Sequence, residues 1–151
     1  MYYGFFHSIS AFCNAGFDLM GESGKFSSFT TLSDNVLVNL VLITLIIVGG
    51  IGFLAWDDIT ACRFKFRSFS LHTKTVLTVT AVLIFSGALL LFAFEHNNTG
   101  LNKPLGEEIM DALFGSVTAR TAGFNTVDTA ELRPASKLVT IILMFIGGSS
   151  G

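Results

Sequence analysis

The stretch that decides the fold is Arg120-Thr121-Ala122-Gly123-Phe124, which repeats the pattern of Cys13-Asn14-Ala15-Gly16-Phe17. In both copies, Ala-Gly-Phe follows a segment of helical character that contains Ser or Thr and precedes a long apolar segment. By this register, Cys13 occupies the position of Arg120. A repeated loop with a central glycine suggests internal symmetry. Irregular backbone at membrane depth is tolerated where it is buried in protein or lines a water-filled path, so the repeat predicts a pore.

The composition argues against a water-soluble protein. Hydrophobic residues make up 51% of the chain and charged residues 13%, and the mean hydropathy is +0.66. These values predict an integral membrane protein. The formal net charge of −2 offers no basic face for nucleic acid. The sequence has no recognisable nucleophile with a base and no phosphate-binding loop, so we expect neither enzymatic activity nor a cofactor.

Three uncharged runs predict membrane spans. Val36–Trp56 has 21 residues without a charge and would rise roughly 31 Å as a helix, which matches a hydrocarbon core of about 30 Å. Val76–Phe94 has 19 uncharged residues and ends before Glu95. A third run begins near Leu138 and is still uncharged where the chain ends at Gly151. Asp34 is the expected N-cap of the first span.

The distribution of basic residues predicts the orientation. The connector 57–75 carries four of them, whereas the connectors 18–35 and 96–112 carry one lysine each. The four are Arg63, Lys65, Arg67 and Lys74. By the positive-inside rule, residues 57–75 are cytoplasmic and both Ala-Gly-Phe copies lie on the outer side of the membrane.

The segment before the second copy is too short to cross the membrane. Only eight uncharged residues separate Asp111 from Arg120, so this segment must enter the membrane and return. Acidic residues at its start, Glu107 and Glu108, suit a helix N-terminus at the outer surface. We expect the same re-entrant path for the first copy, with a short pore helix from about Tyr2 to Cys13.

Each such unit would attract cations. A helix that descends part-way and ends in a glycine loop directs its negative dipole end and a row of carbonyl oxygens toward a common axis. Carbonyl oxygens can replace the hydration shell of a monovalent ion. The alternative is a simple helix C-cap followed by an interfacial aromatic residue. The predicted ion filter comprises Asn14, Ala15, Gly16, Phe17, Thr121, Ala122, Gly123 and Phe124.

Four segments together resemble the Ktr/Trk/HKT superfamily of potassium transporters, and the bacterial Ktr-type membrane subunit in particular. They are His7–Phe17, Gly49–Phe53, Ser116–Asp128 and Gly147–Gly151. The resemblance implies an all-α integral membrane fold with four helix, re-entrant pore-loop, helix repeats in pseudo-fourfold symmetry around one pore. This chain would hold parts of repeats two and three. Residues 1–56 would be a pore helix, filter loop and inner helix, 57–75 the connector, and 76–151 the next outer helix, pore helix, filter loop and truncated inner helix.

The resemblance also implies a transported ion, partners and a location. The ion would be K⁺, and the sequence leaves Na⁺ open because neither loop contains the Thr-Val-Gly-Tyr-Gly filter of ordinary potassium channels. The implied partners are membrane lipid, the missing repeats of the same polypeptide, a second copy in a homodimer and a cytoplasmic nucleotide-binding RCK regulatory subunit. The implied location is the cell (plasma) membrane, crossed several times.

A run of helix-breaking residues follows the third apolar segment. It comprises Gly147, Gly148, Ser149, Ser150 and Gly151. Each glycine costs about 1 kcal/mol relative to alanine in a helix interior, so the helix should break near the midplane. The resemblance implies a gating loop that obstructs the pore below the filter, and the alternative is close helix packing through small residues. We expect the glycines of the segment 49–53 to form a packing notch.

Arg120 needs a partner at membrane depth, where an arginine costs roughly 2.5–3.5 kcal/mol on insertion scales. Asp111, Asp128 or carbonyl groups of the pore helix are the candidates, and Arg120 would then act as a filter brace or tune permeation electrostatically. The leading function is a cation pathway of a potassium or sodium uptake transporter. The alternatives are a secondary transporter whose broken helices bind a small solute at the midplane, and a non-transporting membrane scaffold.

Overall fold

The computed structural model describes residues 2–19, 35–63, 66–96, 98, 104–127 and 131–147. All regular structure in these ranges is helical, which agrees with the predicted all-α class. In chain order the elements are α1 (Tyr2–Phe12), α2 (Val36–Gly50), α3 (Phe53–Ala61), a 3₁₀ turn (Phe66–Ser68), α4 (Leu71–Glu95), α5 (Leu105–Thr121) and α6 (Pro134–Ile146).

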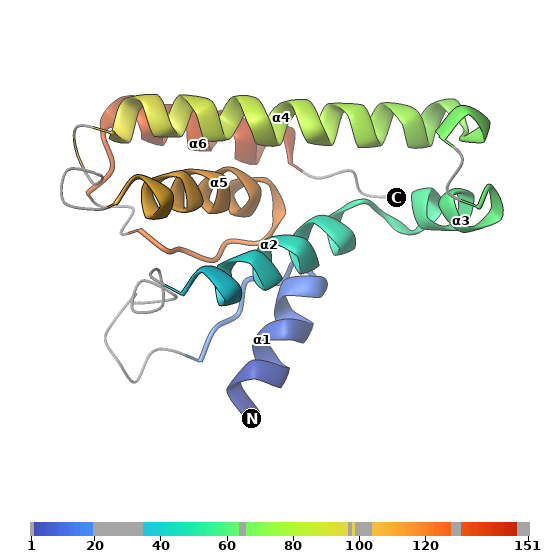
Figure 1. The fold of residues 1–151 in the computed structure, drawn as a ribbon, viewed down its shortest axis with the longest axis horizontal. Coiled ribbons are helices and arrows are strands. Elements are labelled where there is room, and N and C mark those ends of the chain that lie inside the picture. The colour runs from blue at the N-terminus through green and yellow to red at the C-terminus, as the bar shows by residue number, and fades with distance from the viewer. Residues whose placement is uncertain are drawn as a thin grey trace.

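Helix α5 lies at the centre of the arrangement (Figure 1). It packs against α2, α4 and α6, while α1 packs on α2 and α3 packs on α4. The end of α4 and the starts of α5 and α6 lie at one end of the molecule, and the connection between α3 and α4 lies at the other end. Helix α5 therefore runs back alongside α4 and carries the second Ala-Gly-Phe copy into the interior.

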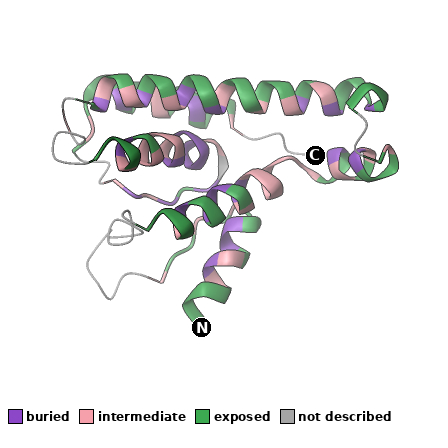
Figure 2. Cartoon of the chain, in the orientation of Figure 1, coloured by how far each residue is buried: buried purple, intermediate pink, exposed green. Residues whose placement is uncertain are grey.

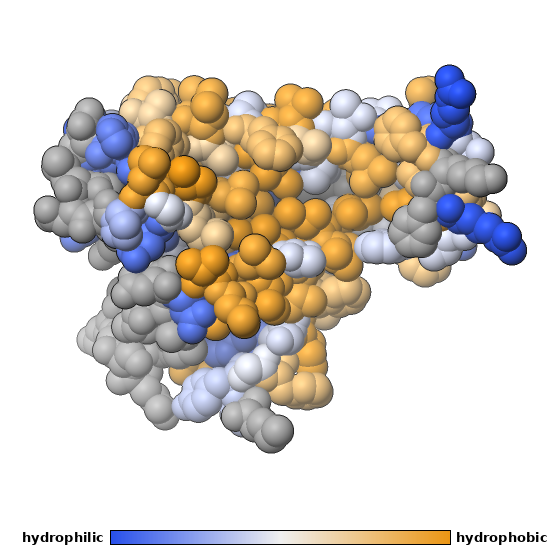
Figure 3. Space-filling view, viewed as in Figure 1, coloured by the Kyte–Doolittle hydropathy of each residue, from blue (hydrophilic) through white to orange (hydrophobic). Residues whose placement is uncertain are grey.

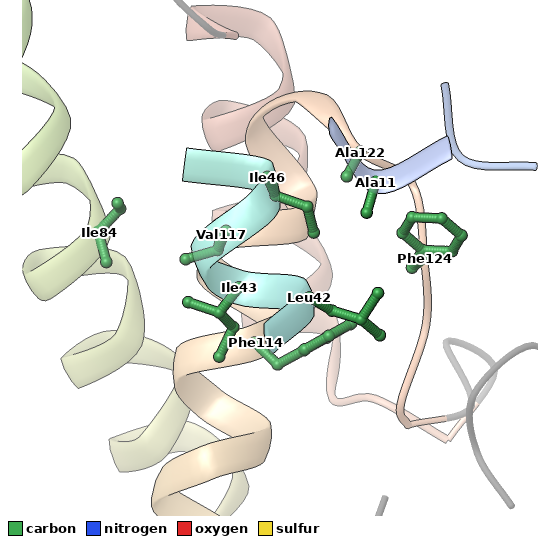
Figure 4. Packing of buried hydrophobic residues seen from close by; sticks show 9 residues of the cluster. All are labelled: Ala11, Leu42, Ile43, Ile46, Ile84, Phe114, Val117, Ala122 and Phe124. Carbon is green, nitrogen blue, oxygen red and sulfur yellow. The ribbon is translucent and has the colours of Figure 1, made fainter. Parts of the chain in front are cut away.

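The buried core joins α2 and α5 to α1, to α4 and to the second glycine loop (Figure 4). Phe114 of α5 and Phe124 of the following loop are completely buried. Between helices that face lipid, association depends on close van der Waals packing and hydrogen bonds rather than on the exclusion of water. The cluster consists of Ala11, Leu42, Ile43, Ile46, Ile84, Phe114, Val117, Ala122 and Phe124.

The predicted span Val76–Phe94 lies within α4. Among the described residues, α4 is the one helix that is long and apolar enough to cross a membrane unaided. Its 25 residues would rise roughly 37 Å. The helix begins five residues earlier than predicted because the Ser70 hydroxyl caps it, accepting a hydrogen bond from the Thr73 N–H at 3.3 Å.

The prediction of one continuous span over Val36–Trp56 is wrong. This segment is divided between α2 and α3, whose axes are bent by 89° at a short break. Gly52 lies in the break with φ 91° and ψ 151°, a backbone region that is essentially restricted to glycine. The Trp56 indole N–H donates to the Val48 carbonyl at 2.8 Å and so bridges the bend.

The glycines of this segment have two different roles. A Cβ on Gly49 would lie 1.9 Å from the Phe12 carbonyl oxygen, so the predicted packing notch is confirmed at Gly49, where α2 contacts the end of α1. Gly52 instead turns the chain. The predicted N-cap is also wrong, because the Asn35 side chain caps α2 by accepting from the Val38 N–H at 3.3 Å. Asp34 lies outside the described residues.

Helix α6 begins at Pro134, four residues before the predicted Leu138. Proline at the first helical position fits because its missing N–H would have no intrahelical partner there. The helix ends at Ile146, and Gly147 leaves it with φ 64° and ψ −161°, again a region restricted to glycine. The remaining residues of the predicted gating loop lie outside the described residues.

The surface is strongly apolar. Large side chains such as Phe145 (93% exposed) and Phe53 (82% exposed) have little contact with the rest of the chain. Green, exposed positions recur along the outer side of α4 (Figure 2). Hydrophobic residues cover the middle of the face in Figure 3, and the hydrophilic ones gather toward its ends. Such a surface is unfavourable in water and suits lipid or further protein.

Candidate functional site

The two Ala-Gly-Phe copies adopt related loop structures after α1 and α5. Gly16 has φ 70° and Gly123 has φ 79°, the left-handed region that favours glycine. Both loops begin at a helix C-terminus, where the partial negative charge of the helix dipole resides. The repeat seen in the sequence is therefore also a repeat of backbone conformation.

A hydroxyl group from the preceding helix holds each loop. The Ser10 hydroxyl donates to the Phe17 carbonyl at 2.8 Å, and the Thr118 hydroxyl donates to the Phe124 carbonyl, also at 2.8 Å. Backbone hydrogen bonds follow the same plan, from the Ala15 N–H to the Ser10 carbonyl and from the Gly123 N–H to the Thr118 carbonyl. The hydroxyl contributed by each pore-type helix was not among the predicted site residues.

These contacts correct the register between the copies. Seven positions separate Ser10 from Phe17, whereas six separate Thr118 from Phe124. The first loop thus contains one additional residue, and Asn14 adopts a positive φ of 50° within it. Counted from the helix, Ala15 corresponds to Gly123 and Cys13 to Thr121, whereas counted from the end of the motif Phe17 corresponds to Phe124. The predicted equivalence of Cys13 and Arg120 is therefore wrong.

The two loops contact one another. A Cβ on Gly16 would lie 2.1 Å from the Ala122 carbonyl oxygen, so this carbonyl approaches the first loop where a side chain is missing. Figure 4 shows Ala11 and Ala122 next to each other, with Phe124 beside them. Gly123 differs, because a Cβ there would meet nothing within 4 Å. The structure thus brings the two predicted filter loops together, with Gly16 at their contact and Gly123 exposed.

Arg120 reaches from the end of α5 to two other helices. Its Nε donates to the Gly147 carbonyl at 3.3 Å, and its Nη2 donates to the Thr80 hydroxyl at 3.4 Å. The partners proposed from the sequence do not include either group. Asp128 lies outside the described residues. The side chain therefore connects α5 with the end of α6 and with α4.

Asn14 makes a similar connection in the first loop. In the amide orientation that satisfies its hydrogen bonds, the nitrogen donates to the Ala11 and Ile46 carbonyls at 3.2 Å, and the oxygen accepts from the Gly50 N–H at 3.0 Å. Ile46 and Gly50 belong to the last turn of α2. The Asn14 amide therefore joins the first loop to the end of α2.

Glu95 joins α4 to the start of α6. Its buried carboxylate accepts from the Arg133 N–H at 2.9 Å and from the Ser136 hydroxyl, and it also accepts from the Asn98 amide at 2.7 Å. The Arg133 side chain does not cap α6, so Glu95 supplies that function from another helix. Sequence reasoning missed this role. The sequence signal that could have indicated the role of Glu95 is an acidic residue at the end of an apolar segment, followed later by a helix that begins with proline and has no capping residue of its own.

A cavity of about 260 Å³ lies between α4, α5, α6 and the second glycine loop. Its wall includes Gly123 and Phe124 together with three carboxylic residues, Glu95, Glu108 and Asp111. Glu108 is buried and lies 2.8 Å from the Nδ1 atom of His96. Negative charge is thereby concentrated beside the second loop, which favours cations over anions in its neighbourhood.

The exposed apolar side chains and the length and composition of α4 are typical of an integral membrane protein. The whole chain, residues 1–151, matches the TrkH family, described as a cation transport protein. The chain therefore belongs to the TrkH family of cation transport proteins, as the resemblance predicted.

Three curated relatives are similar over nearly the whole chain. The potassium/sodium uptake protein NtpJ of Enterococcus hirae is 40% identical over 100% of the chain. The Ktr system potassium uptake protein B of Bacillus subtilis is 40% identical over 96% of it, and that of Vibrio alginolyticus is 39% identical over 99%. In each case the match covers 32% of the relative, so the chain spans about a third of the length of these proteins.

Proposed function

We propose that this chain supplies two neighbouring quarters of the ion pathway of a potassium uptake transporter, with sodium as a second permeating ion. The observation that carries the proposal is the contact between two glycine loops, each of which follows a helix C-terminus. The names of the relatives support the ion, because they refer to potassium or to potassium and sodium.

The proposed filter consists of the backbone carbonyl groups of residues 14–17 and 121–124. The positive φ angles of Gly16 and Gly123 support a loop in which successive carbonyl groups can face one side. The Ser10 and Thr118 hydroxyl groups support a loop held in one conformation. The run from Gly147 to Gly151 would form the gating loop below this filter, and the exit of Gly147 from α6 is consistent with such a loop.

The proposed topology is multi-pass. Residues 1–56 would supply a pore helix, filter loop and inner helix, 57–75 the connector, and 76–151 an outer helix, pore helix, filter loop and truncated inner helix. The filter loops would face the outside of the cell (plasma) membrane and the connector the cytoplasm. The remaining repeats, a second copy of the subunit and a nucleotide-binding RCK subunit complete the proposed assembly. The hydrophilic residues at the ends of the face in Figure 3 support this orientation of the helices across the bilayer.

The function is tested in a full-length chimera, in which this segment replaces the aligned third of the Bacillus subtilis relative. The chimera is expressed in cells without potassium uptake of their own. We expect it to restore uptake, and we expect Gly123→Ser to lower the preference for potassium over sodium by up to about tenfold. A side chain at positive φ costs roughly 1–2 kcal/mol and displaces the coordinating carbonyl groups.

The matched control is Gly106→Ser in the exposed first turn of α5, where a Cβ meets nothing within 4 Å. This variant should keep the ion preference of the parent chimera. Unchanged uptake affinity and unchanged ion preference in both Gly16→Ser and Gly123→Ser would contradict the filter.

A secondary transporter is the second candidate, because the break at Gly52 pairs with the end of α6 at Gly147. Paired breaks in crossing helices can form a midplane site for a solute. Such a transporter requires movement of a solute in step with the cation. Sustained potassium uptake into chimera-containing vesicles in simple salt solutions, with no organic solute present, supports the filter and contradicts this alternative.

A further inference from the structure

Both helices that follow a glycine loop end in the same way. Helix α2 leads into Gly52 (φ 91°, ψ 151°) and α6 leads into Gly147 (φ 64°, ψ −161°). Both conformations belong to a region that is essentially restricted to glycine. The chain therefore contains two helix breaks, each one following its own glycine loop.

One polar side chain connects each loop to the break of the next helix. Asn14 binds the Ile46 carbonyl and the Gly50 N–H at the end of α2. Arg120 binds the Gly147 carbonyl at the end of α6. The Gly147 carbonyl follows the last turn of α6, where carbonyl groups lack intrahelical partners, so Arg120 supplies a donor there. Asn14 instead pairs with one carbonyl and one N–H group near the end of α2.

The two connections differ in stiffness. At the end of α2, the short Asn14 amide makes two hydrogen bonds, and Gly49 touches the Phe12 carbonyl so closely that no side chain fits. At the α6 break, a Cβ on Gly147 would be 3.7 Å from its nearest neighbour, which is ordinary van der Waals contact. The link there is the long guanidinium side chain of Arg120, with Thr80 as its second partner.

We propose that Arg120 is a positioning residue that couples the second glycine loop to the end of α6, whereas Asn14 fixes the end of α2. A displacement of Gly147 pulls on the guanidinium group of Arg120, a residue of the last turn of α5 that lies three positions before Gly123. The position of the α6 end thereby changes the geometry of the second loop. This inference rests on the proposed ion pathway and adds communication between its two parts.

The test is a double-mutant cycle in the chimera, with the ratio of potassium to sodium uptake as the readout. Gly147→Ala shifts the α6 end, and Arg120→Gln removes the charged link. We expect Gly147→Ala to change the ion ratio when Arg120 is present and to have little effect in the Arg120→Gln background. The non-additivity should be about threefold or more, as for residues in direct contact.

A second variant, together with its control, keeps the test valid if Arg120→Gln does not fold. Thr80→Val removes the second partner of the guanidinium group, and it should also reduce the effect of Gly147→Ala. Thr78→Val is the matched control, because its exposed hydroxyl binds the Lys74 carbonyl within α4. Additive effects for both Arg120→Gln and Thr80→Val, or for Thr80→Val alone if Arg120→Gln is unfolded, would overturn the coupling.

The outcome separates this inference from the proposed function. A parent chimera that does not take up potassium contradicts the ion pathway itself. A parent chimera that transports potassium, combined with additive variants, leaves the pathway standing and rejects the role of Arg120. If Arg120 only braced the structure, its replacement would lower the amount of folded protein. The effect of Gly147→Ala on the ion ratio would then be the same with and without Arg120.

Discussion

Gly16 and Gly123 occupy the same place in the sequence repeat but face different surroundings. Both have positive φ, so either one is strained by any other residue. Only Gly16 is also limited by space, because the Ala122 carbonyl occupies the volume of its missing side chain. Phe17 is mostly exposed, whereas Phe124 is completely buried. The two glycines are therefore alike in backbone conformation and unlike in packing.

Gly49→Ala should destabilise the protein at the contact between α1 and α2. The new Cβ would lie 1.9 Å from the Phe12 carbonyl oxygen, so the two backbones must separate. Overpacking of this kind costs typically about 1–3 kcal/mol. The measurement is the apparent melting temperature of the purified chimera in detergent, which should fall. Gly4→Ala is the control, because a Cβ on Gly4 has open space and alanine favours the helix. Equal melting temperatures for the two variants would contradict the close contact.

The sequence repeat was sufficient to locate the loops, because the two copies of Ala-Gly-Phe, at 15–17 and 122–124, are visible without coordinates. It could not reveal the partners of Arg120. The Thr80 hydroxyl and the Gly147 carbonyl lie 40 and 27 positions away, and neither has a charge that would single it out. The extra residue in the first loop was also hidden, since only the hydrogen bonds between the preceding helix and the motif define it.

At the level of helices, the boundaries that follow from apolar runs were the most predictable. The span Val76–Phe94 lies inside α4, and α1 matches the predicted short helix from Tyr2. The bend between α2 and α3 was missed because hydropathy measures the apolar character of a segment and not its direction. Gly49 and Gly52 lie three positions apart, yet one packs against a neighbouring helix and the other turns the chain.

Glu95→Gln should weaken the attachment of α6. The substitution keeps an oxygen acceptor but removes the negative charge that faces the Arg133 N–H and the Ser136 hydroxyl. Hydrogen bonds to charged groups contribute roughly 1.5–3 kcal/mol, so the loss of stability should approach this range. The measurement is the denaturation midpoint of the purified chimera.

Glu107→Gln is the matched control for Glu95→Gln. It makes the same chemical change in the first turn of α5, where the charge acts mainly through the helix dipole and contributes about 0.3–1 kcal/mol. An equal or larger loss of stability in Glu107→Gln would argue against the capping role of Glu95.

For the whole molecule, the junction between α3 and α4 lies at the end opposite to the starts of α5 and α6 (Figure 1). The Asp58 carboxylate accepts from the Ser70 N–H at 2.8 Å, which joins α3 to the start of α4. The Lys74 ammonium group donates to the Arg67 carbonyl at 3.0 Å. Exposed basic side chains at this junction include Arg63 and Arg67.

A photo-crosslinking residue at Arg67 should capture a cytoplasmic regulatory subunit when the chimera is expressed with its partner proteins. The connector carries four basic residues, Arg67 is exposed, and the junction lies at one end of α4. The matched control is the same probe at Leu89, which is 69% exposed in the second half of α4 and should capture lipid. Capture of only lipid or the membrane subunit itself from the Arg67 position would show that these charges serve topology alone.

The buried Glu95 carboxylate holds the first turn of α6, so a rotation of this helix about its attached end would displace its far end. Its 13 residues span roughly 20 Å, so a tilt of about 10° around the Glu95 end moves Gly147 by roughly 3 Å. That displacement is as long as a hydrogen bond, and it is enough to break the contact between Arg120 and Gly147. A small rotation at the Glu95 end of α6 would thus be enough to separate Gly147 from Arg120, without any change in the length or shape of the helix.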